Sequence, residues 1–303
     1  MKNFITIGTM DGVHLGHAAV IAELARLARA HSMKSLVLFL DCPPKAVLSG
    51  DTGQSMITLP AQRRELILRA GADRAECLEF SARFASVSHG EFFETLVAEY
   101  QMGGLLIGRD FAFGRERLGH LDFLRAACAR RDIPLRIMDF RRADGHKISS
   151  SIIRKLLVEG HVEHAARLLG RCYSVGGTVV RGKGLGRRLG FPTANLDAGR
   201  FKILPRGVYA VRVALEGCGR VYGGMANVGF RPTVNTLSGA LPLVEVHILD
   251  FSGDLYGQNI SVEFVTRLRH EKKFKDVAEL SAALAADVEA ARSALAETAA
   301  RKP

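Results

Sequence analysis

The stretch FITIGTMDGVHLGH, residues 4–17, predicts a strand, a glycine-rich turn and the start of a helix. Residues 4–8 form a short apolar run that ends at glycine, and residues 17–31 carry alanine and leucine at helical spacing. The N-terminus of a helix offers unpaired N–H groups and the positive end of a dipole, both of which favour a bound phosphate. We therefore interpret this turn as a phosphate site.

Two histidines in the turn strengthen this interpretation. His14 and His17 are three residues apart and can face one ligand. An imidazole N–H or an imidazolium stabilises charge that builds on a transferring phosphate, so both residues are catalytic candidates. A metal site is disfavoured because no third ligand stands nearby. The alternative is an ordinary turn in which the two histidines have no function. Three glycines at the junction of a strand and a helix favour the phosphate site over this alternative. The predicted nucleotide or phosphate contacts of the turn are Gly8, Asp11 and Gly16.

Strand and helix signals alternate through the first half of the chain. Strands are predicted at 35–40, 105–108 and 134–140, and helices at 60–70, 90–100 and 121–131. This alternation is typical of an α/β fold, a parallel sheet covered by helices, in which ligands bind beyond the carboxyl ends of the strands. Residues 149–170 predict one helix, or two that are broken at Gly160.

The pattern changes after about residue 171, where glycine and proline turns separate extended segments. These segments are residues 173–180, 207–215, 221–228, 243–251 and 259–268. They predict half-buried antiparallel strands in a small β-barrel or sandwich. A terminal helix follows at 276–300, with a buried stripe of Val277, Leu280, Leu284 and Val288. We expect two domains, residues 1–170 and 171–303.

Composition and charge narrow the classes of protein. The 303 residues are 48% hydrophobic, which provides enough apolar material for two cores. A transmembrane helix is not expected because no run approaches about 18 apolar residues, and secretion is not expected because the N-terminus has no apolar leader pattern. Five scattered cysteines without a CxxC pair predict free thiols and a cytoplasmic location. The net charge of +11 favours anionic partners.

The stretch GKGLGRRLGFPTANL, residues 182–196, joins a basic glycine-rich loop to a PTAN segment. Glycine lets a backbone approach phosphate closely. Thr193 and Asn195 point to one side of an extended segment, where their oxygens can share a hard cation such as Mg²⁺. An ordinary turn is the alternative for PTAN, and the adjoining loop disfavours it. The predicted nucleotide or phosphate contacts are Gly182, Lys183, Gly184, Gly186, Gly190, Thr193 and Asn195.

An acidic residue, Glu245, interrupts the apolar strand LVEVHILDF. A carboxylate in such a strand needs a partner or a task. We interpret Glu245 as a candidate base that accepts a proton from an attacking hydroxyl. A salt bridge with one of the many arginines is the alternative.

Two shorter motifs carry weaker signals. ISSSIIR, residues 148–154, starts a helix with serines and an arginine that can bind phosphate, which makes Ser150, Ser151 and Arg154 candidates. GRDFAFG, residues 108–114, can hold a planar ring through Asp110 and Phe111. A pair of core phenylalanines is an equally good interpretation of the second motif.

Together the motifs resemble the bacterial bifunctional riboflavin kinase/FMN adenylyltransferase family, also called FAD synthetases. The resemblance extends over nearly the whole chain. It rests on seven ordered segments: GTMDGVHLGH, GRDFAFGRERLG, ISSSIIRKLLVEGHVEHAARLLG, GKGLGRRLGFPTANL, NVGFRPTV, LVEVHILDF and LRHEKKF. It implies a Rossmann-like nucleotidyltransferase domain followed by a six-stranded riboflavin kinase barrel.

The resemblance also implies chemistry for each domain. The barrel would phosphorylate riboflavin with ATP, with Mg²⁺ and phosphate at Thr193 and Asn195 and with Glu245 as the base. The first domain would join AMP from ATP to FMN to give FAD, with His14 and His17 stabilising phosphates beside Ser150, Ser151 and Arg154. Phe80, Asp110 and Phe111 are the implied flavin contacts. Riboflavin, FMN, FAD and ATP are the expected small-molecule partners.

Departures from the family pattern fall mainly in the first half. Met10 stands where the family has phenylalanine, Pro43 and Ser81 replace polar or acidic residues, and Arg109 precedes Asp110. They motivate an alternative, a riboflavin kinase whose adenylyltransferase domain is weakened. A third hypothesis is nucleic-acid binding, which the absence of Trp and of a known binding motif disfavours. We expect no nucleic-acid or membrane partner, and the sequence leaves a weak homo-oligomer open.

Overall fold

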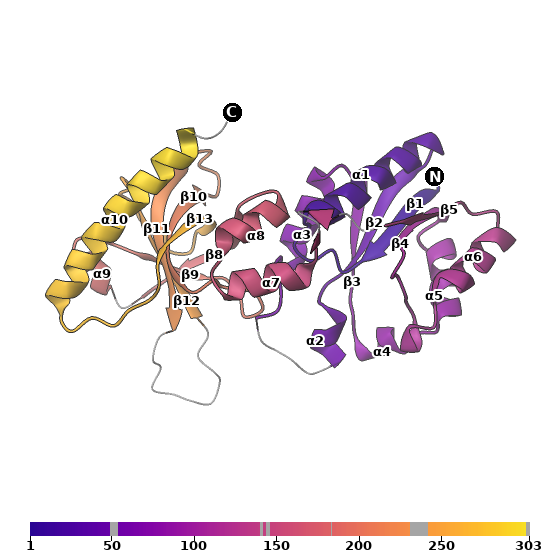
Figure 1. The fold of residues 1–303 in the computed structure, drawn as a ribbon, viewed down its shortest axis with the longest axis horizontal. Coiled ribbons are helices and arrows are strands. Elements are labelled where there is room, and N and C mark those ends of the chain that lie inside the picture. Colours follow the sequence, from indigo (N-terminus) through magenta and orange to yellow (C-terminus); the bar gives the residue numbers. More distant parts are fainter. Residues whose placement is uncertain (49–53, 140–141, 144–145, 183, 231–241, 301–303) are drawn as a thin grey trace. The chain divides into compact units, whose positions relative to one another are not determined.

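The chain forms two compact units, Met1–Ile152 and Ile153–Pro303 (Figure 1). The computed structural model describes residues 1–48, 54–139, 142–143, 146–182, 184–230 and 242–300. Lys183, a predicted nucleotide contact, lies outside the described residues, as does part of the NVGFRPTV segment. The domain boundary near residue 171 stays a prediction.

The first unit is a five-stranded parallel sheet in the order β3-β2-β1-β4-β5, with helices on both faces (Figure 1). The strands are β1 (Asn3–Gly8), β2 (Lys34–Leu40), β3 (Arg74–Leu78), β4 (Met102–Gly108) and β5 (Leu135–Met138). The helices are α1 (Leu15–Ala30), α2 (Pro44–Leu48), α3 (Pro60–Arg69), α4 (Ala82–Ala85), α5 (His89–Ala98) and α6 (Leu121–Arg130). A short turn of 3-10 helix spans Arg115–Arg117, and β6 (Arg142–Ala143) pairs with β7 (His146–Lys147). The predicted α/β fold is confirmed.

Alternate residues of the central strands face two apolar layers. Ile5 packs with Phe93 of α5, whereas its neighbour Phe4 packs with Ile21 and Leu24 of α1. All of these side chains are at most 2% exposed. Burial of each contributes roughly 1.5–3 kcal/mol, so the two layers together hold the strand ends, and the loops that leave them, in fixed places.

The second unit contains a closed antiparallel barrel in the order β10-β11-β12-β9-β8-β13. Its strands are β8 (Tyr173–Val180), β9 (Ala194–Asp197), β10 (Gly207–Leu215), β11 (Val221–Phe230), β12 (Pro242–Ile248) and β13 (Asn259–Arg269). The helices in this half are α7 (Ser150–Val158), α8 (Val162–Leu169), α9 (Leu185–Arg188) and α10 (Val277–Ala300). The predicted barrel and terminal helix are confirmed, and the sandwich alternative is excluded.

Three details differ from the sequence-based expectations. The region 149–170 forms two helices, because Gly160 adopts a left-handed φ of 78°. The short strands β3, β6, β7 and β9 were not predicted. The predicted burial of Val277 is wrong: it is 56% exposed as the first residue of α10, while later turns of α10 pack on the barrel through Leu284 and Ala291.

Among the described residues, no helix combines the length and the apolar character needed to cross a membrane.

Candidate active sites

The first candidate site lies where the strand order of the parallel sheet reverses, between β1 and β4. In open parallel sheets, ligands bind outside the carboxyl ends of the strands at such a point. Strand β1 ends at Gly8, where GTMDGVHLGH begins, and β4 ends at Gly108, where GRDFAFG begins. The topology therefore brings two predicted motifs to one edge of the sheet, although they are about a hundred residues apart in sequence.

The two histidines of the first motif form a stacked pair. His14 is the N-cap of α1, and its Nδ1 accepts a hydrogen bond from the backbone N–H of His17 (3.3 Å). The ring centroids lie 3.6 Å apart with an interplanar angle of 14°. Gly16 permits this arrangement, because a Cβ there would lie 3.0 Å from Cε1 of His14. The two side chains thus lie side by side, and their contact with one ligand stays a prediction.

Burial lowers the pKa of His17 well below its ordinary value, and nearby His14 and Arg63 lower it further. The Nδ1 atom of His17 is buried and has no hydrogen-bond partner among the described residues. At neutral pH the His17 ring is therefore uncharged, and an uncharged imidazole can donate one hydrogen bond to a ligand.

Asp11, a predicted phosphate contact, points into the protein instead. Its carboxylate is 0% exposed and pairs with the guanidinium of Arg63 (Nη2 to Oδ1, 3.1 Å). It also accepts hydrogen bonds from the backbone N–H groups of Ile57 and Thr58. Sequence analysis missed Arg63. Nothing in the sequence separates Arg63 from Arg64 and Arg69 of the same helix, both of which are exposed.

The serine motif approaches the same turn from α7. Ser150 donates a hydrogen bond from Oγ to the backbone oxygen of Asp11 (2.8 Å). Ser151 is exposed at the start of α7, and Arg154 lies one turn further along that helix, half-buried. The structure thus places Ser150 directly against the histidine turn, 139 residues away in the chain.

The predicted flavin contacts belong to a chain of aromatic side chains. Phe80 packs edge-on against Phe84 (5.8 Å between centroids), and Phe111 stacks with Phe113 (5.6 Å). Phe80 and Phe111 are both half-buried, which leaves part of each ring accessible, whereas Asp110 is exposed. Phe111 and Phe113 also pack against the core, as the interpretation as a core pair expects, whereas the flavin contacts stay a prediction.

Some departures from the family pattern have structural explanations. Ser81 is the N-cap of α4 and accepts a hydrogen bond from the backbone N–H of Phe84 (3.2 Å), as an acidic residue at this position would. Arg109 forms an exposed ion pair with Asp139 (2.7 Å), at the end of β5. Met10 is buried, with a left-handed φ of 50°. Nothing in the structure explains Pro43.

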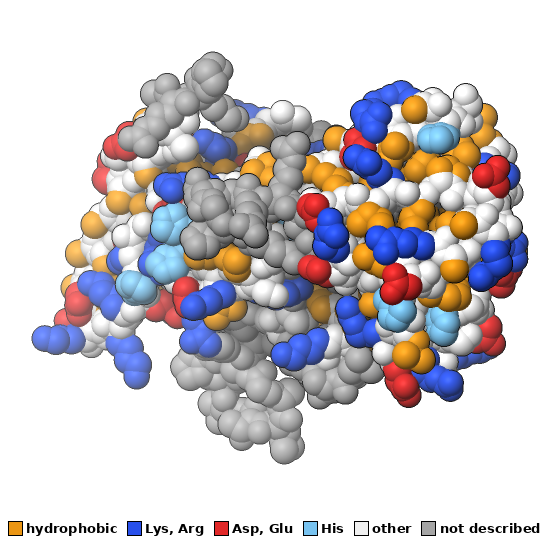
Figure 2. Space-filling view, turned by 45° about the vertical axis from the view of Figure 1, so that its right-hand side comes forward, with side chains coloured by type: hydrophobic (Ala, Val, Ile, Leu, Met, Phe, Trp, Pro, Cys, Tyr) orange, Lys and Arg blue, Asp and Glu red, His pale blue; other side chains and the backbone are white. Residues whose placement is uncertain are grey.

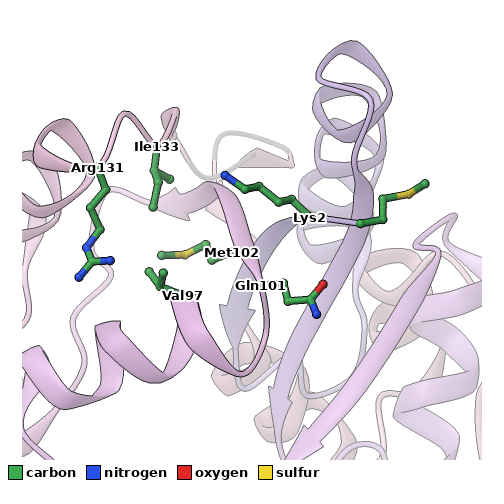
Figure 3. Close-up of a pocket in the computed structure, with 7 residues that line it drawn as sticks. Lys2, Val97, Gln101, Met102, Arg131 and Ile133 are labelled. Carbon is green, nitrogen blue, oxygen red and sulfur yellow. The ribbon is translucent and has the colours of Figure 1, made fainter.

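A hollow of about 600 Å³ lies at the opposite edge of the sheet, near the amino ends of β1 and β4 (Figure 3). Lys2, Gln101 and Met102 line one side, and Arg131 stands across from them. Arg131 is already paired with Glu94 (2.7 Å). None of the predicted site residues lines this hollow, so it is separate from the first candidate site.

The second candidate site lies on the outer face of the barrel. Asn195 of β9 pairs directly with Glu245 of β12, and Glu245 pairs with Asn227 of β11. Directly paired residues of antiparallel strands point to the same face, about 5 Å apart. The flanking residues Val244 and Val246 fill the barrel interior. Asn227 is therefore a neighbour of the predicted base, which a scan of single motifs could not find.

The glycines of the basic loop pack directly against the PTAN side chains. A Cβ on Gly182 would collide with the amide of Asn195, which is only 5% exposed. A Cβ on Gly186 would collide with the backbone oxygen of Phe191 and lie 3.4 Å from Oγ1 of Thr193. Gly184 and Gly190 have left-handed φ angles of 69° and 86° instead. Two of these glycines thus serve the predicted metal ligands by leaving room for them.

Oxygen donors dominate this second site. Thr193 and Asn195 offer neutral side-chain oxygens, and no cluster of three His, Cys, Asp or Glu side chains suited to a metal occurs among the described residues. This donor set fits Mg²⁺, which takes few protein ligands and is held largely by substrate phosphates and water. It does not fit zinc, which prefers nitrogen and sulfur ligands.

Comparisons with known proteins match both halves of the chain. Residues 1–152 match the family model described as FAD synthetase, and residues 169–295 match riboflavin kinase. A bifunctional riboflavin kinase/FMN adenylyltransferase of Pseudomonas fluorescens is 36% identical, over 98% of this chain and 94% of that protein. One of Haemophilus influenzae is also 36% identical, over 95% and 93%. The crystal structure of a macrolide-efflux protein from Streptococcus pneumoniae has a TM-score of 0.83 at 31% identity, over 96% and 94%.

A parallel nucleotide-binding sheet followed by a barrel with a basic loop defines a transferase that uses nucleotides at two sites. The chain belongs to the family of bifunctional riboflavin kinases/FMN adenylyltransferases. It carries a riboflavin kinase domain and an FAD synthetase domain. A chain with the kinase alone is not favoured, because the FAD synthetase match covers the whole of residues 1–152.

Proposed function

We propose that this chain converts riboflavin to FMN in its barrel and FMN to FAD in its parallel-sheet domain, with ATP as the co-substrate of both steps. The first step transfers the terminal phosphoryl group of ATP to the ribityl hydroxyl of riboflavin and releases ADP. The second transfers AMP from ATP to the phosphate of FMN and releases pyrophosphate. The observation that carries the proposal is the full-length match to bifunctional relatives together with both sites on one chain.

In the kinase step, Glu245 accepts the proton of the attacking hydroxyl. Its place beside Asn195 in the sheet register supports this role, because a general base must lie close to the phosphate that the hydroxyl attacks. Thr193 and Asn195 hold Mg²⁺, and Gly182, Lys183, Gly184, Gly186 and Gly190 form the loop over the nucleotide. When bound, Mg²⁺ neutralises charge on the phosphate oxygens.

In the adenylyl step, His14 and His17 donate hydrogen bonds to the phosphates of ATP. The position of both rings at the N-terminus of α1 and the uncharged ring of His17 support this assignment. Gly8 and Gly16 let the backbone approach, and Ser150, Ser151 and Arg154 extend the phosphate site. Such transfers depend on positioning and charge stabilisation rather than covalent catalysis. Phe80 and Phe111 contact the flavin, with Asp110 beside them.

The direct test is product analysis. The purified chain is incubated with ATP and either riboflavin or FMN, with Mg²⁺ and with EDTA, and flavins are separated by chromatography. FAD formed from both substrates with Mg²⁺, and from neither substrate with EDTA, supports both active sites and their need for the metal. FMN from riboflavin without FAD from either substrate would contradict the adenylyl step and restore the kinase-only alternative.

A cytoplasmic location is proposed because the substrates are cellular nucleotides and all five cysteines are free thiols. Nucleic-acid binding is the third candidate, motivated by the net charge of +11. On the face drawn in Figure 2, basic side chains are interspersed with acidic and hydrophobic ones and form no continuous stripe over the described residues. Duplex DNA that competes with ATP at physiological salt would favour this candidate.

A further inference from the structure

The turn that carries His14 and His17 is strained. Met10 and Val13 have left-handed φ angles of 50° and 38°, and Gly12 between them has a φ of 85°. Met10 and Val13 are also buried, at 5% and 4% exposure. A left-handed conformation is unfavourable for a β-branched residue such as Val13, so it persists only where the surroundings impose it.

The guanidinium of Arg63 supplies this constraint. Arg63 is 0% exposed, and its donors reach the backbone oxygens of Thr9 (3.0 Å), Thr58 (2.7 Å) and Leu40. It also pairs with the carboxylate of Asp11. One side chain thus ties the segment after β1 to the end of β2 and to the segment that precedes α3.

Thr58 completes the connection to the turn. Its Oγ1 accepts a hydrogen bond from the backbone N–H of Gly12 (2.9 Å) and donates one to Asp11 (3.1 Å). From the other side, Ser150 donates to the backbone oxygen of Asp11. The strained residues are therefore held from both sides, and the chain leaves the turn directly into His14.

We propose that Arg63 is a positioning residue for adenylyl transfer, which acts through Asp11 and Thr58 to hold the strained turn so that His14 and His17 meet the phosphates. Arg63 itself does not touch the nucleotide. A planar guanidinium suits this task because it donates several hydrogen bonds in fixed directions, which a lysine ammonium cannot reproduce. The inference rests on the proposed roles of the two histidines.

The test compares Arg63→Met with Arg64→Met in the full-length chain. Arg64 is the exposed neighbour on the same helix, so it controls for loss of charge and for the substitution itself. Circular dichroism and a cooperative urea unfolding transition of the first unit report that each variant is folded, because the riboflavin kinase site lies in the other unit. We expect Arg63→Met to lower kcat for FAD formation from FMN about a hundredfold with a smaller change in KM for ATP, because a displacement of catalytic groups by about 1 Å has an effect of this size. Arg63→Lys should retain more of the wild-type kcat than Arg63→Met, because the ammonium can still pair with Asp11.

Thr58→Val is the second test if Arg63→Met does not fold, because it removes the hydroxyl that joins Gly12, Asp11 and Arg63 but keeps the guanidinium and the carboxylate. We expect a loss of about tenfold in kcat. The melting temperature should fall as well, because the buried N–H of Gly12 loses its acceptor, while unfolding stays cooperative. Adenylyl transfer within about threefold of wild type in either folded variant would overturn the inference. His17→Gln separates the two levels: full activity in His17→Gln would contradict the proposed function itself, whereas an inactive His17→Gln beside a fully active Arg63→Met would contradict only the role of Arg63.

Discussion

His14 and His17 stack so closely that two positive charges on them would repel each other. Burial and the neighbouring Arg63 act in the same direction, and together they lower the pKa of His17. A positive charge on each ring would attract phosphate more strongly, but burying the charged His17 would cost desolvation free energy. In the proposed role, an uncharged His17 donates a hydrogen bond in a fixed direction and avoids the cost of a buried charge.

This state of His17 predicts how stability depends on pH. The unfolded chain takes up a proton on His17 as the pH falls through about 6.5, whereas the folded chain does so only at lower pH. The free energy of unfolding of the first unit therefore decreases from about pH 6.5 downward, by at most about 1.4 kcal/mol per pH unit from this residue. Urea unfolding at pH 7.5 and 5.5 measures it. His17→Gln should reduce the difference and the exposed His120→Gln should not; equal pH dependence in both variants would contradict the prediction.

At the scale of elements, the basic loop of residues 182–190 packs directly against strand β9. Gly182 lacks a side chain at the position where Asn195 places its amide, so the loop and the predicted metal ligand fit together only in one arrangement. The same loop returns through Phe191, whose ring contacts His247 of β12 edge-on (5.8 Å). The barrel strands thus hold both ends of the loop.

Gly182→Ala is therefore expected to displace Asn195 rather than to unfold the barrel. We expect riboflavin phosphorylation to fall at least about tenfold in kcat/KM, because the displaced amide no longer aligns with the phosphates. Gly176→Ala in β8 is the matched control, since a Cβ there meets only the backbone oxygen of Ile260 at 3.7 Å. Steady-state kinetics of FMN formation measure both, and equal rates would show that Asn195 tolerates the displacement.

The terminal helix α10 is fixed to the barrel by a partly buried ion pair. Arg269 of β13 reaches Asp287 (2.6 Å), whose side chain is 8% exposed. Asp287→Ala leaves the guanidinium without this partner and should lower the free energy of unfolding by about 2 kcal/mol, less than for a fully buried pair because Arg269 keeps contact with water. Asp250→Ala removes an exposed ion pair with Arg292, which also lies on α10. It should lower the free energy of unfolding much less. Chemical denaturation compares the two, and similar losses would contradict this account.

At the scale of the whole molecule, the histidine turn and the strand residues around Glu245 lie in different units of the chain. The histidine turn is built within Met1–Ile152, and the row of Asn195, Glu245 and Asn227 within Ile153–Pro303. The side-chain hydrogen bonds described for the backbone of the histidine turn come from Thr58, Arg63 and Ser150 of the first unit. Loss of one activity should therefore leave the other in place.

Glu245→Ala tests this independence. We expect FMN formation from riboflavin to fall by about 10²–10⁴-fold, the usual contribution of a general base, while FAD formation from supplied FMN stays near wild type. His17→Gln should give the reverse pattern. Chromatography of the flavin products measures both reactions in one preparation. Loss of both activities in folded Glu245→Ala would show that the sites depend on each other.

The sequence by itself predicted the parallel-sheet and barrel architectures and named the candidate residues of both sites. Local patterns carry this information: helical spacing, alternation of valines, and glycines beside basic residues or histidines. Only the tertiary structure showed that Asp11 points inward to pair with Arg63, that Asn227 neighbours Glu245, and that Val277 is exposed. Each depends on residues far apart in the chain being brought together, through strand register or a buried side chain, and no local pattern records which distant partner a residue meets.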